Sequence, residues 1–301
     1  MKAKELVLGT AQLGFKYGIA NKEGEPTIDR AFSIMKFAVE LGISYFDTAY
    51  SYGESEARIG KFSKIYREYG NKINIITKIP SLKGKIINKE RINKYFFESL
   101  KRLNRNSIYC YMIHNFDDIV NNSKIINEAF LSLKEEGFIE KIGVSVYDKF
   151  QIEYLLKNFR FDLIQLPVNI FDQRLLRSGI LYDLKKKNIE IHARSIFLQG
   201  LIFMDKNSLP SSLVGAVPYL EKLEKVSLEV GATKMEIALS FVNPISEIDK
   251  IVIGVEKVEQ LKQAVNAFNK VRNSDKLKNI ITFDSFAIED ENIIDPRRWI
   301  K

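Results

Sequence analysis

The stretch LVLGTAQLGFKYG, residues 6–18, decides between two kinds of α/β fold. It begins with a short apolar run and continues into a segment that contains Gly9 and Gly14. A doubly wound sheet that binds dinucleotides carries the pattern G-x-G-x-x-G after its first strand, where glycines let the backbone approach a pyrophosphate. Gly9 and Gly14 do not have the spacing of that pattern, so this stretch argues against a doubly wound sheet and favours a barrel.

Seven more apolar runs follow along the chain. Each is short, β-branched and apolar nearly throughout, which is typical of parallel strands that are covered on both faces. Segments of helical period lie between them; in one, Thr27 can cap a helix and Gly42 can end it. Eight strand-and-helix units in 301 residues predict a (β/α)₈ TIM barrel with its active site at the C-terminal ends of the strands. The predicted strands are 6–11, 44–49, 73–79, 109–115, 141–146, 163–169, 189–197 and 250–256.

The chain shows no linker, repeat or shift of composition, so we expect a single domain over residues 1–301, with residues 272–301 as a tail that packs on the barrel. No apolar run approaches the ~20 residues of a membrane span. The single cysteine, Cys110, cannot form an internal disulfide. We therefore expect a cytoplasmic protein without a membrane partner. The oligomeric state stays open, and a monomer is compatible with the sequence.

The formal net charge of +8 raises the question of a nucleic-acid partner. Lys and Arg are dispersed, however, with acids between them along segments that have helical period. That pattern is typical of a solvated surface, so we expect no nucleic acid. A modest positive field also suits an anionic cofactor or substrate.

Polar residues stand late in four consecutive predicted strands. Asp47, Lys78, His114 and Ser145 end the second to the fifth strand, and in a barrel these ends meet at one rim. Each residue alone has a structural explanation, but four together predict a functional site. The other histidine, His192, falls near the beginning of the seventh strand, and we interpret it as structural.

Carbonyl reduction suits these residue types. A zinc hydrolase needs about three ligands, and only one histidine is well placed; no G-x-S-x-G elbow is present either. A tyrosine beside a lysine that an aspartate holds in place is expected to have a lowered pKa and to serve as a proton donor near neutral pH. Spacing alone does not choose between Tyr50 and Tyr52 as that donor.

Six segments resemble the aldo/keto reductase superfamily, in order and from about Leu8 to Ala267. They resemble its F-D-T-A-x-x-Y-G-x-S-E signature, its T-K strand, its S-L-x-R-L…D-x-Y-x-x-H segment, its G-K-I-x-x-I-G-V-S-N segment, its Q-x-x-x-N strand and its P-G-x-x-x-x-E-Q-L-x-E-N segment. In this chain they read FDTAYSYGESEARIG, IITKI, LKRLNRNSIYCYMIHN, LKEEGFIEKIGVSVYD, LIQLPVN and IVIGVEKVEQLKQA.

The resemblance implies an NAD(P)H-dependent aldo/keto reductase that reduces a small aldehyde or ketone, with a sugar or another polar carbonyl compound as a candidate substrate. It makes Tyr52 the proton donor and Tyr50 a loop aromatic. It makes Lys78 the group that lowers the pKa of Tyr52 and Asp47 the partner of Lys78. For His114 it implies either a hydrogen bond to the carbonyl oxygen or a tuning effect on Tyr52.

The resemblance also implies a nicotinamide cofactor that lies across the barrel mouth. Two departures bear on its binding: Arg194 stands where many members stack an aromatic ring on the nicotinamide, and Glu256 stands, with Lys257 beside it, where a basic residue often meets the 2′-phosphate. We expect NADPH, with NADH as the alternative. The implied cofactor-binding residues are Gly9, Thr10, Asp47, Ser145, Gln165, Arg194, Ser195, Gly254, Glu256, Lys257, Gln260 and Gln263.

Two alternatives remain at this point. A nucleotide-binding regulatory subunit without strong catalysis is one, because the β subunits of voltage-gated potassium channels resemble the same family. A basic nucleic-acid-binding barrel is the other. Substrate selectivity is expected in residues 115–125, 198–214 and 272–301, because barrel loops vary while the rim is constant. Within them Asn115, Asp117, Gln199, Arg297 and Arg298 are candidates to meet a polar or anionic substrate.

Overall fold

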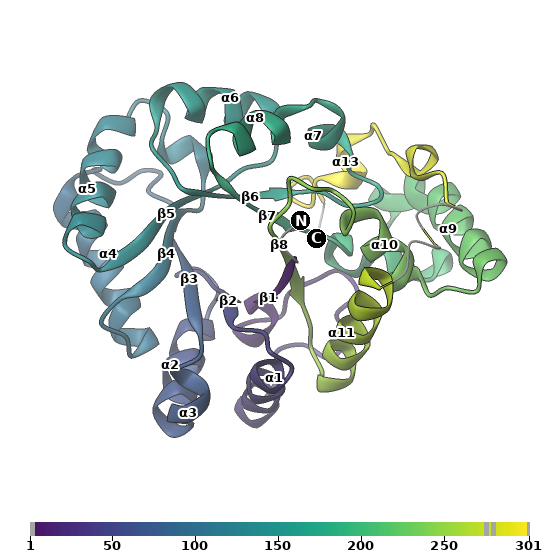
Figure 1. Ribbon diagram of the computed structural model, residues 1–301, viewed down its shortest axis with the longest axis horizontal. Coiled ribbons are helices and arrows are strands. Elements are labelled where there is room, and N and C mark those ends of the chain that lie inside the picture. The colour runs from purple at the N-terminus through teal and green to yellow at the C-terminus, as the bar shows by residue number, and fades with distance from the viewer. Residues whose placement is uncertain (1–3, 274–276, 278–280, 300–301) are drawn as a thin grey trace.

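The computed structural model describes residues 4–273, 277 and 281–299, and these form a closed barrel of eight parallel strands with helices around it (Figure 1). Each strand pairs with the next one in the sequence, and the eighth pairs with the first. The predicted TIM barrel is therefore confirmed. Strands in this order bring all eight C-terminal ends to one rim of the molecule.

Each of the eight predicted apolar runs overlaps a strand. Every strand except the third ends before its run does, because the run continues into the loop that follows. The seventh run is an example: its strand stops at Arg194, since Ser195 has a φ of 60° that a strand does not accommodate. The strands are β1 (Glu5–Gly9), β2 (Tyr45–Asp47), β3 (Asn74–Ile79), β4 (Ile108–Ile113), β5 (Ile139–Ser145), β6 (Leu163–Pro167), β7 (Glu190–Arg194) and β8 (Lys250–Gly254).

The helices follow the apolar periodicity of the segments between the strands. The first begins as its sequence predicts, since the Thr27 side chain accepts a hydrogen bond from the Arg30 backbone N–H. The helices are α1 (Ile28–Glu40), α2 (Ser55–Ile65), α3 (Arg67–Gly70), α4 (Lys89–Leu103), α5 (Ser123–Glu135), α6 (Lys149–Asn158), α7 (Arg174–Arg177), α8 (Ile180–Lys186), α9 (Val217–Val230), α10 (Lys234–Val242), α11 (Val258–Arg272) and α13 (Glu291–Ile294).

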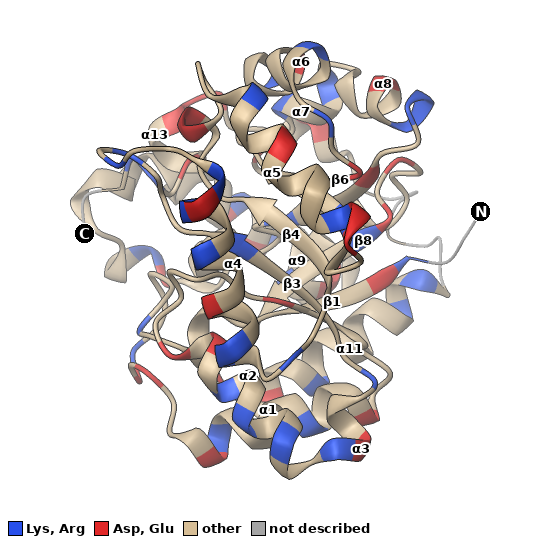
Figure 2. Ribbon diagram, turned by 90° about the vertical axis from the view of Figure 1, so that its left-hand side faces the viewer, with Lys and Arg blue, Asp and Glu red and all other residues tan. Residues whose placement is uncertain are grey.

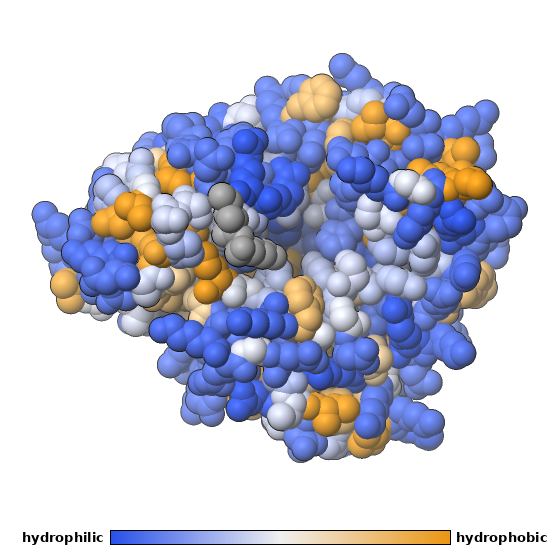
Figure 3. Space-filling view, turned by 180° about the vertical axis from the view of Figure 1, so that it is seen from behind, coloured by the Kyte–Doolittle hydropathy of each residue, from blue (hydrophilic) through white to orange (hydrophobic). Residues whose placement is uncertain are grey.

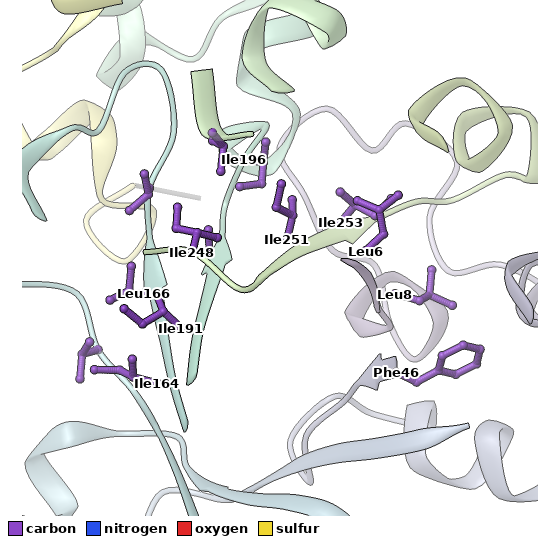
Figure 4. Packing of buried hydrophobic residues seen from close by; sticks show 14 of the residues in the cluster. Leu6, Leu8, Phe46, Ile164, Leu166, Ile191, Ile196, Ile248, Ile251 and Ile253 are labelled. Atoms are coloured by element: carbon purple, nitrogen blue, oxygen red, sulfur yellow. The ribbon is translucent and has the colours of Figure 1, made fainter. Parts of the chain in front are cut away.

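The apolar core has two parts. The larger lies between the strands and the surrounding helices, and Figure 4 shows part of it, with Leu8, Ile191 and Ile253 projecting from three different strands. The smaller fills the barrel interior with side chains such as Cys110 and Met112. Each fully buried aliphatic side chain contributes roughly 1.5–3 kcal/mol. This packing holds the strand ends in fixed positions.

The described part of the C-terminal tail contacts the barrel through α7 and the loop before it. Arg174 pairs with Glu291 at 2.7 Å, and the Ile288 N–H donates to the Phe171 carbonyl. The Trp299 indole N–H donates to the Ile293 carbonyl and the ring is buried. The rest of the predicted tail, residues 274–276, 278–280 and 300–301, lies outside the described residues.

Lys and Arg alternate with Asp and Glu along the helices in Figure 2, which matches the dispersed charge of the sequence. None of the helices in residues 4–273, 277 and 281–299 is long and apolar enough to cross a membrane.

Candidate active site

The C-terminal ends of the strands surround a cavity of about 1390 Å³. The face seen in Figure 3 is hollowed near its middle. All four residues predicted to be catalytic line the cavity, and so do all of the predicted cofactor-binding residues except Lys257.

A buried ion pair forms the floor of the cavity. The Lys78 Nζ atom, from β3, lies 2.7 Å from both carboxylate oxygens of Asp47, from β2, and donates a third hydrogen bond to the Thr48 carbonyl. The Gln165 amide donates to Asp47 Oδ1 at 2.6 Å. Burial lowers the pKa of Lys78, and the Asp47 carboxylate opposes that shift. The pair is thus held by three strands and by hydrogen bonds on both partners.

Tyr52 lies directly beside this ion pair, on the loop between β2 and α2. The Lys78 Nζ atom is 5.0 Å from the centre of its ring. The rings of His114 and Phe15 flank it, with centroid distances of 5.6 and 6.1 Å. The Tyr52 hydroxyl makes no hydrogen bond to any described residue, so it is available to a molecule in the cavity.

The expected lowering of the Tyr52 pKa is not found. Burial raises this pKa, and the negative charge of Asp47 adds to the rise. The main cause is burial of the phenol, and the Asp47 carboxylate beside Lys78 offsets the effect of the ammonium on Tyr52. Burial also lowers the pKa of His114 to about 3, with the charges of Lys78 and Arg194 adding to that effect. At neutral pH the phenol is therefore protonated and the imidazole uncharged.

The structure separates the two tyrosines that the sequence left as alternatives. Tyr50 points to α4, where its hydroxyl donates to Glu98 at 2.8 Å and its ring lies 3.7 Å from the Arg102 guanidinium carbon. It does not line the cavity. Tyr52 therefore has the better position for proton donation, and Tyr50 anchors the loop.

Glycine at position 53 is required by the turn that presents Tyr52. Its φ is 51°, and a Cβ atom there would lie 2.3 Å from the Gly14 carbonyl oxygen. The loop is fixed further by a hydroxyl chain, in which Thr10 Oγ1 donates to the Asp47 carbonyl and accepts from Ser55 Oγ at 2.7 Å. The signature segment thus serves to hold one phenol in place.

Two glycines lie at the cavity wall where β1 and β8 end. Gly9 and Gly254 are register partners at the ends of β1 and β8. A Cβ atom at Gly254 would lie 2.4 Å from the Gln12 side chain, and one at Gly9 would lie 3.3 Å from the Ile253 carbonyl oxygen. The absence of these side chains brings backbone and Gln12 to the cavity wall.

Lys257 is placed differently from what the resemblance implies. It does not line the cavity, and its ammonium group forms an ion pair with Glu23 from the segment between β1 and α1. Glu256 does line the cavity, and burial, with the charge of Glu23, raises its pKa. Sequence spacing could not reveal the pair, because Glu23 and Lys257 are at opposite ends of the chain.

Several lining residues were missed by the sequence analysis. Gln12, Tyr17 and Lys22 come from the long segment after β1, and Tyr147 follows β5. The length of the segment after β1 was the available signal, since long loops at this rim commonly carry ligand contacts. Among the predicted selectivity residues, Gln199 and Arg297 line the cavity, whereas no residue of 115–125 does so.

His192 is remote from this set. It sits within β7, is fully buried, and its Nε2 atom lies 2.6 Å from Glu190 at the start of the strand. Glu190 in turn binds Tyr109 and Lys141. The structural interpretation of His192 is consistent with these contacts. Across the described ranges no group of three His, Cys, Asp or Glu residues is arranged to hold a metal.

Comparison with known proteins agrees with the barrel fold. The chain matches the sequence model of the Aldo/keto reductase family over residues 5–284, and it belongs to that family. This makes it an oxidoreductase.

Similar proteins come from bacteria and a plant. An uncharacterized oxidoreductase of Bacillus subtilis, YqkF, is 27% identical over 81% of this chain and 84% of that protein. L-galactose dehydrogenase of Arabidopsis thaliana is 25% identical over 91% of this chain and 86% of its own. Among solved structures, the holo form of an aldo-keto reductase from Bacillus halodurans has a TM-score of 0.75 at 23% identity, covering 98% of this chain and 95% of that one.

Proposed function

We propose that the protein reduces an aldehyde or ketone to an alcohol with a reduced nicotinamide cofactor, and that Tyr52 donates the proton. The observation that carries this proposal is the position of the Tyr52 ring, 5.0 Å from the Nζ atom of Lys78 that is ion-paired with Asp47. The His114 ring lies edge-on to the same phenol, with 5.6 Å between the ring centres.

The residues of the cavity fit a nicotinamide cofactor. Gly9 and Gly254 let the Gln12 side chain and the Ile253 backbone pack closely at the cavity wall. Ser145 and Gln165, which are register partners on β5 and β6, supply polar groups at the floor. Thr10, Ser195, Gln260 and Gln263 line the remaining length. When bound, the cofactor supplies the hydride.

The protein's own groups would handle the proton and the developing charge. Tyr52 is protonated over the physiological range, since burial raises its pKa, and so it holds a proton at its Oη atom for the substrate oxygen. Uncharged His114 can donate a second hydrogen bond to that oxygen. Lys78 and Asp47 position the phenol, and Lys78 places a positive charge near the oxygen as it becomes negative.

We propose NADPH as the cofactor. Lys22 lines the cavity, forms no ion pair within the described residues and suits a 2′-phosphate. Lys234 and Lys270 also line the cavity but pair with Glu224 and Glu236, and Glu256 opposes a phosphate. The comparison that tests this is the dissociation constant of NADPH against that of NADH, followed by cofactor fluorescence. Lys22→Met should weaken NADPH and leave NADH unchanged; equal effects on both contradict the assignment.

The substrate is proposed to be a polar carbonyl compound, such as a sugar derivative. Gln199 and Arg297 offer polar contacts in the cavity, and the similar plant protein is named for its action on a sugar. A screen of aldehydes and keto-sugars, followed by loss of reduced nicotinamide, identifies the class.

Tyr52→Phe tests the assignment of the acid. It removes one hydroxyl, so reduction should fall by about 10²–10⁴-fold while cofactor affinity stays within a few-fold. Tyr50→Phe is the matched control, because it removes a hydroxyl from the same loop on the side away from the cavity, and turnover should stay within about threefold. Full turnover in Tyr52→Phe contradicts the proposal. Cofactor binding by the wild-type protein without turnover of any carbonyl in the screen favours the regulatory alternative.

A further inference from the structure

Arg194 is a cation at the cavity wall that no carboxylate neutralises within the described chain. Its guanidinium group donates to the Val146 carbonyl at 2.9 Å and to Ser195 Oγ at 3.3 Å. Its Nε atom is buried and has no acceptor among the described residues. A buried guanidinium normally has an acid partner, because an uncompensated charge in a confined site is costly.

The other arginine of this wall differs from Arg194 in one respect. The Tyr147 ring lies between the two, with the guanidinium carbons of Arg194 and Arg297 at 4.0 and 3.5 Å from its centre. Two such groups fit only on opposite faces of one ring. Arg297 is held by the Asp295 carboxylate at 2.6 Å, so its charge is compensated.

None of the four acids that line the cavity forms an ion pair with Arg194. Asp47 binds Lys78 and Gln165, Glu236 pairs with Lys270, and Asp205 accepts from the Asn207 backbone N–H. Glu256, the fourth, makes no ion pair with Arg194. With Asp47 and Lys78 paired, and with Tyr52 and His114 uncharged, the charges of these four groups and Arg194 sum to one positive unit.

That charge acts at the reacting groups. The positive charge of Arg194 helps to lower the pKa of His114 and opposes the rise in the pKa of Tyr52. A hydride donor must come within ~3–3.5 Å of the carbonyl carbon whose oxygen Tyr52 protonates. The nicotinamide ring must therefore lie at the same end of the cavity as Tyr52, where the Arg194 charge is felt.

We propose that Arg194 makes the site discriminate between the two redox states of the cofactor, binding the reduced form in preference to the oxidised form. This inference rests on the proposed function. The reduced nicotinamide ring is uncharged, whereas the oxidised ring is a pyridinium cation that the uncompensated guanidinium repels. The residue thus favours uptake of the reduced cofactor and release of the oxidised one, which suits an enzyme that works as a reductase.

The size of the effect follows from the charges. Two unit charges about 5 Å apart at an effective dielectric constant near 20 correspond to roughly 250-fold in affinity. The cavity is open to solvent, which screens part of this interaction, so we expect a ratio of dissociation constants, oxidised to reduced, of at least about 10.

The experiment measures that ratio by calorimetric or fluorescence titration of NADPH and NADP⁺, and of NADH and NAD⁺. The adenosine and phosphate contacts are common to both redox states, so they cancel in the ratio. Arg194→Met, which keeps length but removes charge, should reduce the ratio at least about tenfold, mainly by tightening the oxidised form. Arg194→Lys is the matched control and should keep the ratio within about threefold.

The outcomes separate the inference from the proposed function. Either of two results overturns the inference. One is a wild-type ratio of dissociation constants, oxidised to reduced, at or below one, and this measurement does not depend on whether a variant folds. The other is an equal change in both affinities in Arg194→Met. Wild-type protein that binds neither redox state overturns the proposed function as well. Thermal melting of each variant shows whether it is folded at the titration temperature.

Discussion

The barrel holds a buried ionic network at each of its two ends. At the C-terminal end, Asp47 pairs with Lys78 beneath Tyr52. At the N-terminal end, the Glu190 carboxylate accepts hydrogen bonds from Tyr109 and His192. Lys141 pairs with it too, and Lys250 lies 3.4 Å away and is shared with Glu5. The two networks have similar residue types, but the Asp47–Lys78 pair is buried, whereas Lys141 and Glu5 at the N-terminal end are partly exposed.

The difference lies in what each network leaves unused. At the N-terminal end the charged groups bind one another. Burial alone would raise the pKa of Glu190, but hydrogen bonds from His192, Lys141 and Tyr109 outweigh burial, so the pKa of Glu190 is lowered. At the C-terminal end the Tyr52 hydroxyl and the uncharged His114 face the cavity instead. A functional site is therefore marked by polar atoms that are buried at a cavity and still available, and a buried ion pair alone does not mark one.

Breaking the C-terminal pair should damage both activity and stability. Lys78→Met leaves the Asp47 carboxylate buried without its cation, so the free energy of unfolding should fall by about 3–5 kcal/mol. Turnover should fall by about 10²–10⁴-fold, because the phenol loses the neighbouring positive charge. Urea unfolding and carbonyl reduction measure the two effects.

The double variant Asp47→Asn/Lys78→Met separates these effects. It removes both charges, so most of the lost stability should return while turnover stays low. Turnover that recovers together with stability would show that Lys78 acts only as a structural residue, and the two ends of the barrel would then be alike.

The barrel and the rim could be predicted from sequence because both depend on local patterns. Continuous apolar runs define parallel strands, and a polar residue late in a strand must lie at the C-terminal rim. Asp47, Lys78 and His114 were placed in this way. The choice of Tyr52 over Tyr50 came from the family resemblance alone, because the direction of each ring depends on α4 and on the turn at Gly53.

What the sequence could not predict depends on contacts between distant segments. Lys257 pairs with Glu23 rather than lining the cavity, and Arg194 has no acid partner within the described residues. The direction of the Tyr52 pKa shift was predicted wrongly, because the prediction considered the ammonium of Lys78 but not the burial of the phenol. Burial and the Asp47 charge both raise this pKa. In each case the outcome is a balance of charges that only the folded arrangement shows.

Breaking the N-terminal network should affect stability alone. Glu190→Gln keeps the size of the side chain but removes the charge that Lys141, Lys250 and His192 share. The free energy of unfolding should therefore fall by about 3 kcal/mol. This value is at the low end for a buried ion pair, because Lys141 is partly exposed. Turnover should stay within about threefold at a temperature where both proteins are folded. A loss of turnover comparable with that of Lys78→Met contradicts the division between the two ends.

The two histidines offer the smallest and most selective comparison, because each lies at one end. Burial lowers the pKa of both His114 and His192 below the ordinary value of about 6.5. Below that pH the unfolded chain takes up protons that the folded protein does not, so stability must fall as the pH falls, with the loss from His114 continuing toward its folded pKa of about 3.

Removing one histidine should remove its share of this pH dependence. His114→Asn is suited to the test, because the only polar contact of that ring within the described chain is a 3.4 Å approach to Ser51. Between pH 7 and pH 5 the free energy of unfolding should fall by about 1–2 kcal/mol less in the variant than in the wild type. A histidine whose pKa falls from about 6.5 to about 3 on folding accounts for about 2 kcal/mol over this range, and the water that the cavity admits reduces that contribution. The remaining slope then belongs to His192 and the carboxylates. Urea unfolding at each pH measures the two stability curves. Curves that run parallel would show that His114 protonates as readily in the folded protein as in the unfolded chain. The imidazole could then not be treated as uncharged beside Tyr52.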